Sequence, residues 1–210
     1  MNASRFLIWF FTTYTRWLYW RAFAKVDIRS EYIPSATQST LYVLNHHYWF
    51  DALTPLLLNQ RFFRQKLLAI MDQVQIEKRP FFAKLGAIPI DRSNARNAIK
   101  TLDQASDWLN EPGTSVYLYP QGKLTDSIEP IVLESGVVRL IENAPMADVV
   151  PIGMHIHFRS GPKPELVIRI GKPIVFPSNA PKALVLQTVQ HAIRQELEKI
   201  PVSISPRQLV

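Results

Sequence analysis

The chain has 210 residues and a formal net charge of +7, and it contains no cysteine. Hydrophobic residues make up 47% and charged residues 20%, which excludes a disordered chain and an ordinary integral membrane protein. The lack of cysteine excludes disulfides, thiolate nucleophiles and cysteine zinc sites, and it suits a reducing compartment. The length suits one domain with a substantial core.

The positive charge is concentrated near the N-terminus. Arg5, Arg16, Arg21 and Lys25 all precede the first acidic residue, Asp27. A basic protein can bind nucleic acid, anionic lipid or phosphorylated substrates. The other basic residues form no single run and no known nucleic-acid-binding motif, so we expect no nucleic-acid partner.

Residues 1–25 are predicted to form a helix that lies in the membrane interface. They contain nine of the 23 aromatic residues: Phe6, Trp9, Phe10, Phe11, Tyr14, Trp17, Tyr19, Trp20 and Phe23. The longest uncharged stretch, residues 6–15, is too short for a span of about 20 residues, and no signal-peptide cleavage site follows. Arg5, Thr12 and Arg16 share a helical stripe that the tryptophans avoid, which favours binding at the cytoplasmic face of a membrane. The alternative is a helix packed on the protein's own core.

Strands and helices alternate along the rest of the chain. Residues 26–40 are predicted to be a polar connection. Apolar or alternating runs predict strands at residues 41–44, 66–71, 86–90, 115–119, 149–153, 155–158 and 165–170. Helical periodicity and end signals predict helices at residues 52–60, 73–85 with a break at Pro80, 94–110, 132–143 and 186–200.

This alternation predicts an α/β fold, with a largely parallel sheet flanked by helices. We expect a single domain over residues 26–200, preceded by the N-terminal helix and followed by a loose tail at residues 201–210. Polar clusters follow three predicted strands directly, at residues 45–51, 91–92 and 121–123. Ligands bind at the carboxyl ends of parallel strands, so these clusters predict one shared site. A histidine and Asp51 in the first cluster have the chemistry of a general base and its orienting acid.

Four blocks in this region carry a family resemblance. The first is N-H-x-x-x-x-D, from Asn45-His46 to Asp51, and the second is G-x-x-x-x-x-R, from Gly86 to Arg92. The third, usually F-P-E-G-T-R-S, reads YPQGKLT at residues 119–125, and the fourth, V-P-[IV], lies at residues 150–152. In this order they resemble the glycerolipid acyltransferases typified by 1-acylglycerol-3-phosphate O-acyltransferase, over roughly residues 40–155.

The resemblance implies transfer of a fatty acyl group from acyl-CoA or acyl-carrier protein to a hydroxyl of a lysophospholipid such as 1-acylglycerol-3-phosphate. It implies His46 as general base and Asp51 as its orienter, with no cofactor besides the acyl donor. The implied substrate-binding residues are Asn45, Arg92, Gln121, Gly122 and Lys123. No G-x-S-x-G motif is present, so we expect direct attack by the acceptor hydroxyl. Backbone N–H groups around Gly122 are candidates for the oxyanion site.

The neighbouring histidine offers a second assignment. His47 lies four residues before Asp51, the spacing at which side chains pair on a helix. If the helix began as early as His47, that residue would be the partner of Asp51. The motif register instead selects His46.

The third block departs from the family pattern. Gln121 replaces the usual Glu, and Lys123-Leu124 replaces the usual Thr-Arg. Loss of the arginine removes a bidentate phosphate ligand, and a lysine supplies only a point charge. The acceptor could therefore be an amino-acid lipid or a glycosylated lipid. A non-catalytic lipid-binding protein, and a hydrolase that uses water as acceptor, remain alternatives.

Two further histidines are candidate metal ligands. His155 and His157 are two residues apart in a predicted strand and face the same way. Because no cysteine and no evident third ligand accompany them, we expect structural or surface roles and no metal.

Overall fold

The structure is a computed structural model that describes residues 5–125, 130–158 and 162–200. Within these residues, seven strands form one sheet in the order β1-β7-β6-β2-β5-β3-β4. The strands are β1 (Lys25–Ser30), β2 (Thr40–Leu44), β3 (Lys66–Asp72), β4 (Ala87–Ile90), β5 (Thr114–Leu118), β6 (Asp148–His157) and β7 (Glu165–Ile170). All neighbours pair in parallel except β6 and β7. The predicted α/β fold with a largely parallel sheet is confirmed.

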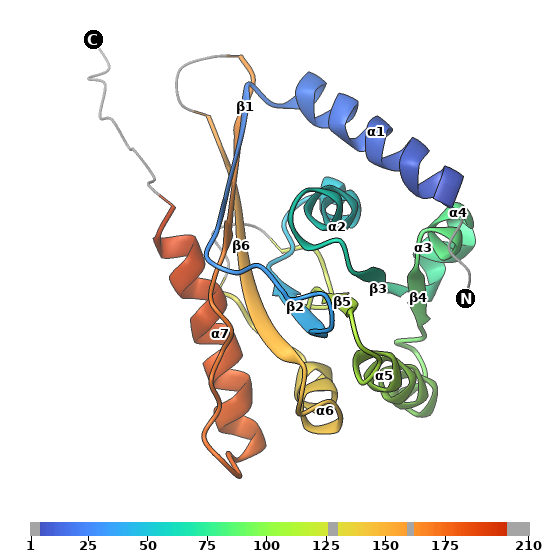
Figure 1. The fold of residues 1–210 in the computed structure, drawn as a ribbon, viewed down its shortest axis with the longest axis vertical. Helices are drawn as coiled ribbons and strands as arrows, with labels where there is room; N and C mark the ends of the chain where they lie inside the picture. The colour runs from blue at the N-terminus through green and yellow to red at the C-terminus, as the bar shows by residue number, and fades with distance from the viewer. Residues whose placement is uncertain (1–4, 126–129, 159–161, 201–210) are drawn as a thin grey trace.

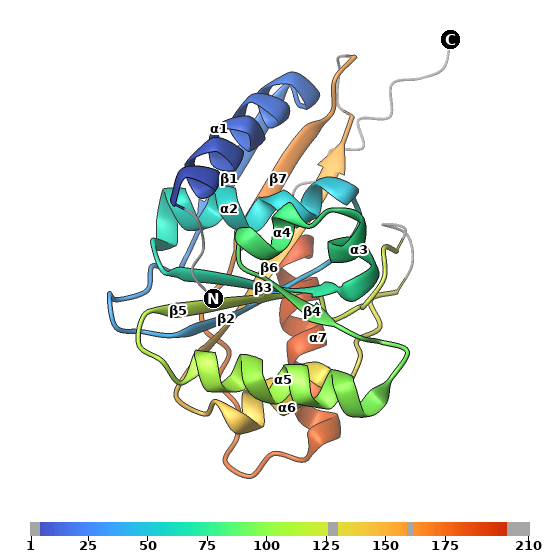
Figure 2. The same cartoon turned by 90° about the vertical axis from the view of Figure 1, so that its right-hand side faces the viewer.

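Helices cover both faces of this sheet (Figures 1 and 2). On one face lie α1 (Arg5–Ala22), α2 (Thr54–Leu58), α3 (Gln73–Lys78) and α4 (Phe81–Lys84). On the other face lie α5 (Ala95–Leu109), α6 (Gly136–Asn143) and α7 (Lys182–Glu198). Short helical turns flank α2, namely η1 (Trp49–Leu53) and η2 (Asn59–Phe63). Each face of the sheet therefore has its own apolar layer.

The central strands are apolar because helices bury them on both sides. All residues of β2 and β5 are buried, and their side chains alternate between the two core layers. Leu41 and Val43 pack toward α5 and α6, whereas Tyr42 and Leu44 pack toward α1 and α2. β2 lies between β5 and β6, so the chain that leaves β2 enters the middle of the carboxyl edge of the sheet.

Three predictions about the bounds of strands and helices need correction. Residues 26–40 are not only a connection, because β1 occupies their start and pairs with β7. None of its residues is fully buried, and Lys25 and Arg29 are exposed, as is typical of a strand at the edge of a sheet. The predicted helix at 132–143 begins later, at Gly136, and the two runs at 149–153 and 155–158 form one strand, β6.

The N-terminal helix uses two faces. Thr12, Thr15 and Tyr19 are buried, and the Tyr19 hydroxyl lies 2.7 Å from that of Thr54 in α2. The expected polar stripe is therefore wrong at Thr12, whose hydroxyl donates to the Ile8 carbonyl within the helix and so needs no water. The opposite face exposes six large side chains: Phe6, Trp9, Phe10, Tyr14, Trp17 and Trp20.

The helix thus packs on the core, as the alternative interpretation held, and it also presents aromatic rings to solvent. Binding of this exposed face to a membrane stays a prediction. Among the described residues, no helix is both long and apolar enough to cross a membrane. The predicted tail at residues 201–210 lies outside the described residues.

Candidate active site

His46 and Asp51 meet directly beyond the end of β2. His46 Nδ1 lies 3.0 Å from Asp51 Oδ2, and the two side chains are 22% and 9% exposed. An ionised carboxylate can only accept hydrogen bonds, so Nδ1 carries the proton and Nε2 keeps a lone pair. His46 also lines the large cavity described below. The pair therefore has the geometry of a base held in one tautomer by an acid.

The carboxylate is fixed by the turn that it closes. Asp51 Oδ2 accepts the backbone N–H groups of His47 and Tyr48, each at 2.9 Å. These bonds start the helical turn η1 at Trp49, and they hold the carboxylate in place even without the imidazole. His47 therefore contacts Asp51 through its backbone, while its side-chain Nδ1 lies 3.0 Å from the Thr125 carbonyl oxygen. The geometry brings His46, and not the His47 ring, to the acid.

The side chain of Gln121 holds the backbone of His46 through a hydrogen bond. Its Oε1 accepts the His46 backbone N–H at 2.7 Å, and its Nε2 donates to Thr125 Oγ1 at 2.5 Å. The backbone N–H of Thr125 closes the network by donating to the His46 carbonyl at 3.0 Å. Gln121 is 4% exposed and does not line the cavity. The amide thus keeps an acceptor for His46 where the family pattern has a carboxylate.

Asn45 has a similar supporting position. It is fully buried at the end of β2, and its side-chain amide bonds both backbone groups of Met154 in β6. These two bonds, at 2.8 and 2.7 Å, continue the pairing of β2 with β6 beyond the last paired residues, with a side-chain amide in place of the backbone. Neither Asn45 nor Gln121 faces the cavity, so the structure favours a positioning role for both over the predicted substrate contact.

Tyr119 was not among the predicted site residues. Its hydroxyl donates to the Asp51 carbonyl at 2.5 Å, and its ring centroid lies 4.5 Å from that of His46. Tyr119 is partly buried, and desolvation raises the pKa of its hydroxyl well above the usual value, so the hydroxyl stays a donor. A tyrosine where the family pattern has phenylalanine was the available signal in the sequence.

Arg92 follows β4 and contacts both the third block and the segment before α6. One guanidinium nitrogen donates to the Gly122 carbonyl, and the other pairs with the Glu134 carboxylate. Gly122 has a φ of +69°, and a side chain there would overlap the Glu134 carboxylate. The backbone N–H of Gly122 donates to the Tyr119 carbonyl at 3.0 Å, so this particular group is not available to an oxyanion. No motif pointed to Glu134, which lies 42 residues from Arg92 in the sequence.

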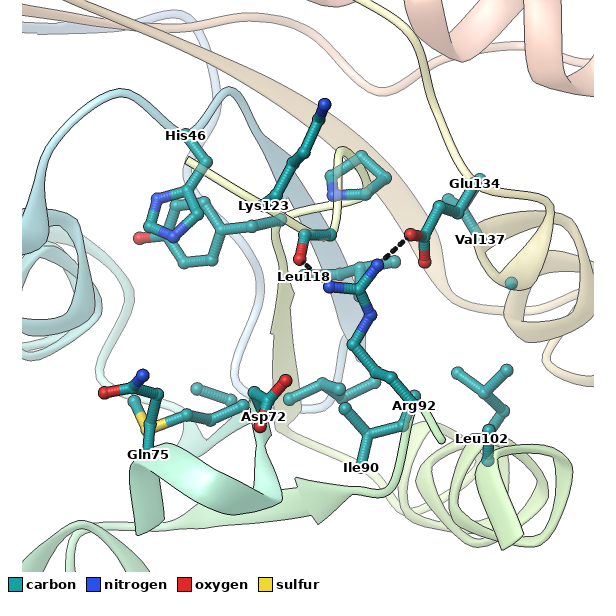
Figure 3. Close-up of a pocket in the computed structure, with 18 of the residues that line it drawn as sticks. His46, Asp72, Gln75, Ile90, Arg92, Leu102, Leu118, Lys123, Glu134 and Val137 are labelled. Carbon is teal, nitrogen blue, oxygen red and sulfur yellow. Dashed lines mark hydrogen bonds and ion pairs between the residues drawn. The ribbon is translucent and has the colours of Figure 1, made fainter. Parts of the chain in front are cut away.

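A cavity of about 1660 Å³ opens beside these groups. Figure 3 shows His46 on one side, the Arg92–Glu134 pair on another and Lys123 between them in this view. The wall between the sheet and α5 is apolar, with lining residues Ile70, Ile90, Ile99, Leu102 and Leu118. The other end reaches Phe11 and Tyr14 of α1, and Tyr14 also belongs to the exposed aromatic face. The cavity is large enough for lipid chains, and it opens next to that face.

The other histidine pair lies in β6. The rings of His155 and His157 are 5.6 Å apart, and His157 Nε2 lies 3.7 Å from Glu165. Burial lowers the pKa of His155, and the nearby His157 and His47 lower it further. Among the described residues, no group of three or more His, Asp or Glu side chains is arranged to hold a metal ion.

An imidazole–carboxylate pair at the carboxyl edge of a mostly parallel sheet, beside a large and partly apolar cavity, defines an α/β protein with a candidate general base at a ligand-sized cavity. Comparison with known families identifies it further. The acyltransferase family matches residues 25–155, more than half of the chain, and the chain belongs to this family. The resemblance seen in the four sequence blocks is thereby confirmed.

The fold is similar to that of a solved acyltransferase. It matches the crystal structure of the 1-acyl-sn-glycerophosphate (LPA) acyltransferase PlsC from Thermotoga maritima, with a TM-score of 0.68 and 14% sequence identity. The match covers 93% of this chain and 80% of that chain. No curated protein sequence matches this chain.

Proposed function

We propose that this protein transfers a fatty acyl group from the thioester of CoA or acyl-carrier protein to a hydroxyl of a lipid acceptor at a membrane surface. The single observation that carries the proposal is the His46–Asp51 pair at the wall of the cavity, in a chain of the acyltransferase family. An alcohol is a weak nucleophile until its proton is removed, and an imidazole is suited to removing it near neutral pH.

The reaction requires one base and no enzyme nucleophile. His46 Nε2 takes the proton of the acceptor hydroxyl as its oxygen attacks the thioester carbonyl carbon. A carbon–oxygen bond forms, the carbon–sulfur bond breaks, and the proton passes from His46 to the leaving thiolate. Asp51 stabilises the imidazolium that exists between these proton transfers.

The supporting residues give this base its position. Gln121 and Thr125 hold the backbone of His46, and Tyr119 holds the carbonyl of Asp51. Catalysis depends on placement to within a fraction of an ångström, so these contacts contribute to rate without touching substrate. We assign them, together with Asn45, as positioning residues.

The exposed aromatic face of α1 supports action at a membrane surface. Its tryptophans would sit at headgroup depth, and exposed Arg16 and Arg21 would lie near anionic lipid. Because the cavity opens beside Tyr14 on the same helix, a lipid could enter the site without crossing water.

Two classes of acceptor remain. Arg92 at the cavity, together with the similarity to PlsC, supports a lysophospholipid such as 1-acylglycerol-3-phosphate. The pairing of Arg92 with Glu134, and Leu124 in place of the family arginine, support an acceptor without phosphate, such as a glycolipid or an amino-acid lipid.

The decisive experiment measures acyl transfer from labelled acyl-CoA and acyl-carrier protein to a panel of these acceptors. We expect product with the wild type and with His47→Ala, and none with His46→Ala. If only His47→Ala abolished turnover, the assignment of the base would be wrong. Tight lipid binding without turnover on any acceptor would instead support a non-catalytic lipid-binding protein, and thioester cleavage with water alone would support a hydrolase.

A further inference from the structure

The charges around Arg92 determine which headgroup an acceptor can present to this part of the cavity. Both terminal nitrogens of the guanidinium are engaged, one by the Gly122 carbonyl and one by Glu134 Oε1. Within the described part of the chain, the other Glu134 oxygen makes no hydrogen bond. The pair is partly open to solvent, with Arg92 38% and Glu134 55% exposed. A ligand in the cavity therefore meets a donor and an acceptor side by side, not an isolated positive charge.

Two further contacts hold Glu134 in this position. Its backbone N–H donates to the Pro120 carbonyl at 2.7 Å, which ties the segment before α6 to the third block. The lack of a side chain at Gly122 leaves the space that the carboxylate occupies. The contact is thus built from both sides and is not a chance approach of two surface side chains.

Two of the other cations along the cavity are paired with acids. Arg139 forms a bidentate pair with Asp103, and Lys182 lies 3.3 Å from Glu142. Lys123 and Arg79 line the cavity without an acidic partner among the described residues: Arg79 donates to the side-chain amide oxygen of Gln75, and the single charge of Lys123 is a weaker phosphate ligand than an arginine fork. A phosphate monoester dianion would have to sit against the Glu134 carboxylate, which it repels.

Neutral hydroxyls suit the same surface better. A hydroxyl can donate to the carboxylate and accept from the guanidinium at once. Across the cavity, Asp72 and Gln75 present another carboxylate and amide (Figure 3). We propose that Glu134 is a specificity-determining residue, and that the acceptor presents uncharged hydroxyls, as a sugar or polyol headgroup does, to the Arg92–Glu134 pair in preference to a phosphate. This inference rests on the proposed acyl transfer and decides between its two acceptor classes.

The test compares acceptors that differ in phosphate. Values of kcat/KM are measured for 1-acylglycerol-3-phosphate, for 1-acylglycerol and for a glycosylated acylglycerol. We expect the wild type to prefer the two neutral acceptors. Glu134→Gln keeps the shape and removes the charge, so it should raise kcat/KM for the phosphate acceptor about fivefold, the upper end for exposed charge pairs, and lower that for the glycosylated one.

A matched control removes the same charge elsewhere. Glu111 pairs with Lys66 at the amino edge of the sheet, away from the cavity. Glu111→Gln should therefore leave kcat/KM unchanged for all three acceptors. A wild type that prefers the phosphate acceptor, with no gain in Glu134→Gln, would overturn the proposal.

Failure of the proposed acyl transfer can be distinguished from failure of the inference about Glu134. Absence of product with every acceptor would contradict the proposed function, whatever the acceptor charge. Titration with inorganic phosphate, followed by NMR of the Arg92 side chain, then still decides the inference. Glu134→Gln should bind phosphate about fivefold more tightly than the wild type, and equal affinities would overturn the role of Glu134.

Discussion

His46 and Asp51 form a contact of 3.0 Å between imidazole Nδ1 and carboxylate Oδ2 at the end of the central strand β2. The same oxygen accepts two backbone N–H groups from the turn between the two residues. The acid is therefore held by its own loop before it orients the base, so the pair is organised in the free protein.

Asp51→Asn should lower kcat by about 10²–10⁴-fold. The amide is close in shape, but it cannot stabilise the imidazolium as a carboxylate does, and it can turn its NH₂ group toward His46 and favour the wrong tautomer. Steady-state transfer to the best acceptor measures the loss, and thermal unfolding reports on the loop. A kcat within threefold of the wild type would show that the carboxylate serves only the fold.

Gln121→Leu should lower both stability and activity. It leaves the backbone N–H of His46 without its side-chain acceptor, which costs about 1–3 kcal/mol of the free energy of unfolding. Denaturant unfolding and kcat measure the two effects. Gln121→Glu retains an acceptor for His46 and should restore most of the activity, whereas equal loss in both variants would argue against this role.

Removing two exposed tryptophans, in Trp9→Ala/Trp20→Ala, should weaken binding to anionic vesicles by at least about tenfold, while the melting temperature changes little. Their side chains are 61% and 74% exposed, so they contribute little to the folded core. Met146→Ala is the control, because Met146 is 85% exposed on a loop that precedes β6. Sedimentation with vesicles checks the prediction, and unchanged binding in the double variant would contradict a membrane role for α1.

Acid should destabilise the protein partly through His155. Burial lowers its pKa in the folded state, so the unfolded chain binds more protons as pH falls below the ordinary value of about 6.5. Stability is then present above that pH and is lost as pH decreases toward the folded pKa. His155→Gln should reduce the fall in melting temperature between pH 7.5 and 5.5, and His191→Gln, on the exposed side of α7, should not. Equal falls in both variants would exclude this contribution.

The order of strands and helices followed from local patterns, because apolar alternation and helical periodicity act over a few residues. The miss at β1 has a physical reason. Val26 and Ile28 are only partly buried at the edge of the sheet, so the strand carries a short and weak apolar signal. The later start of α6 also has a physical reason. The backbone N–H of Glu134 donates to the Pro120 carbonyl, so this segment is held by the third block and is not part of the helix.

The sequence by itself determined the acyltransferase motifs, the alternation that builds a parallel sheet, and the close spacing of His46 and Asp51. These features are local, and a base and an acid only five residues apart in the sequence stay close in any fold. Only the tertiary structure decided which histidine ring contacts Asp51. It also brought Gln121 to the backbone of His46 and paired Glu134 with Arg92. Those contacts join segments that are 75 and 42 residues apart, and they exist because β2, β5, β3 and β4 end side by side at one edge of the sheet.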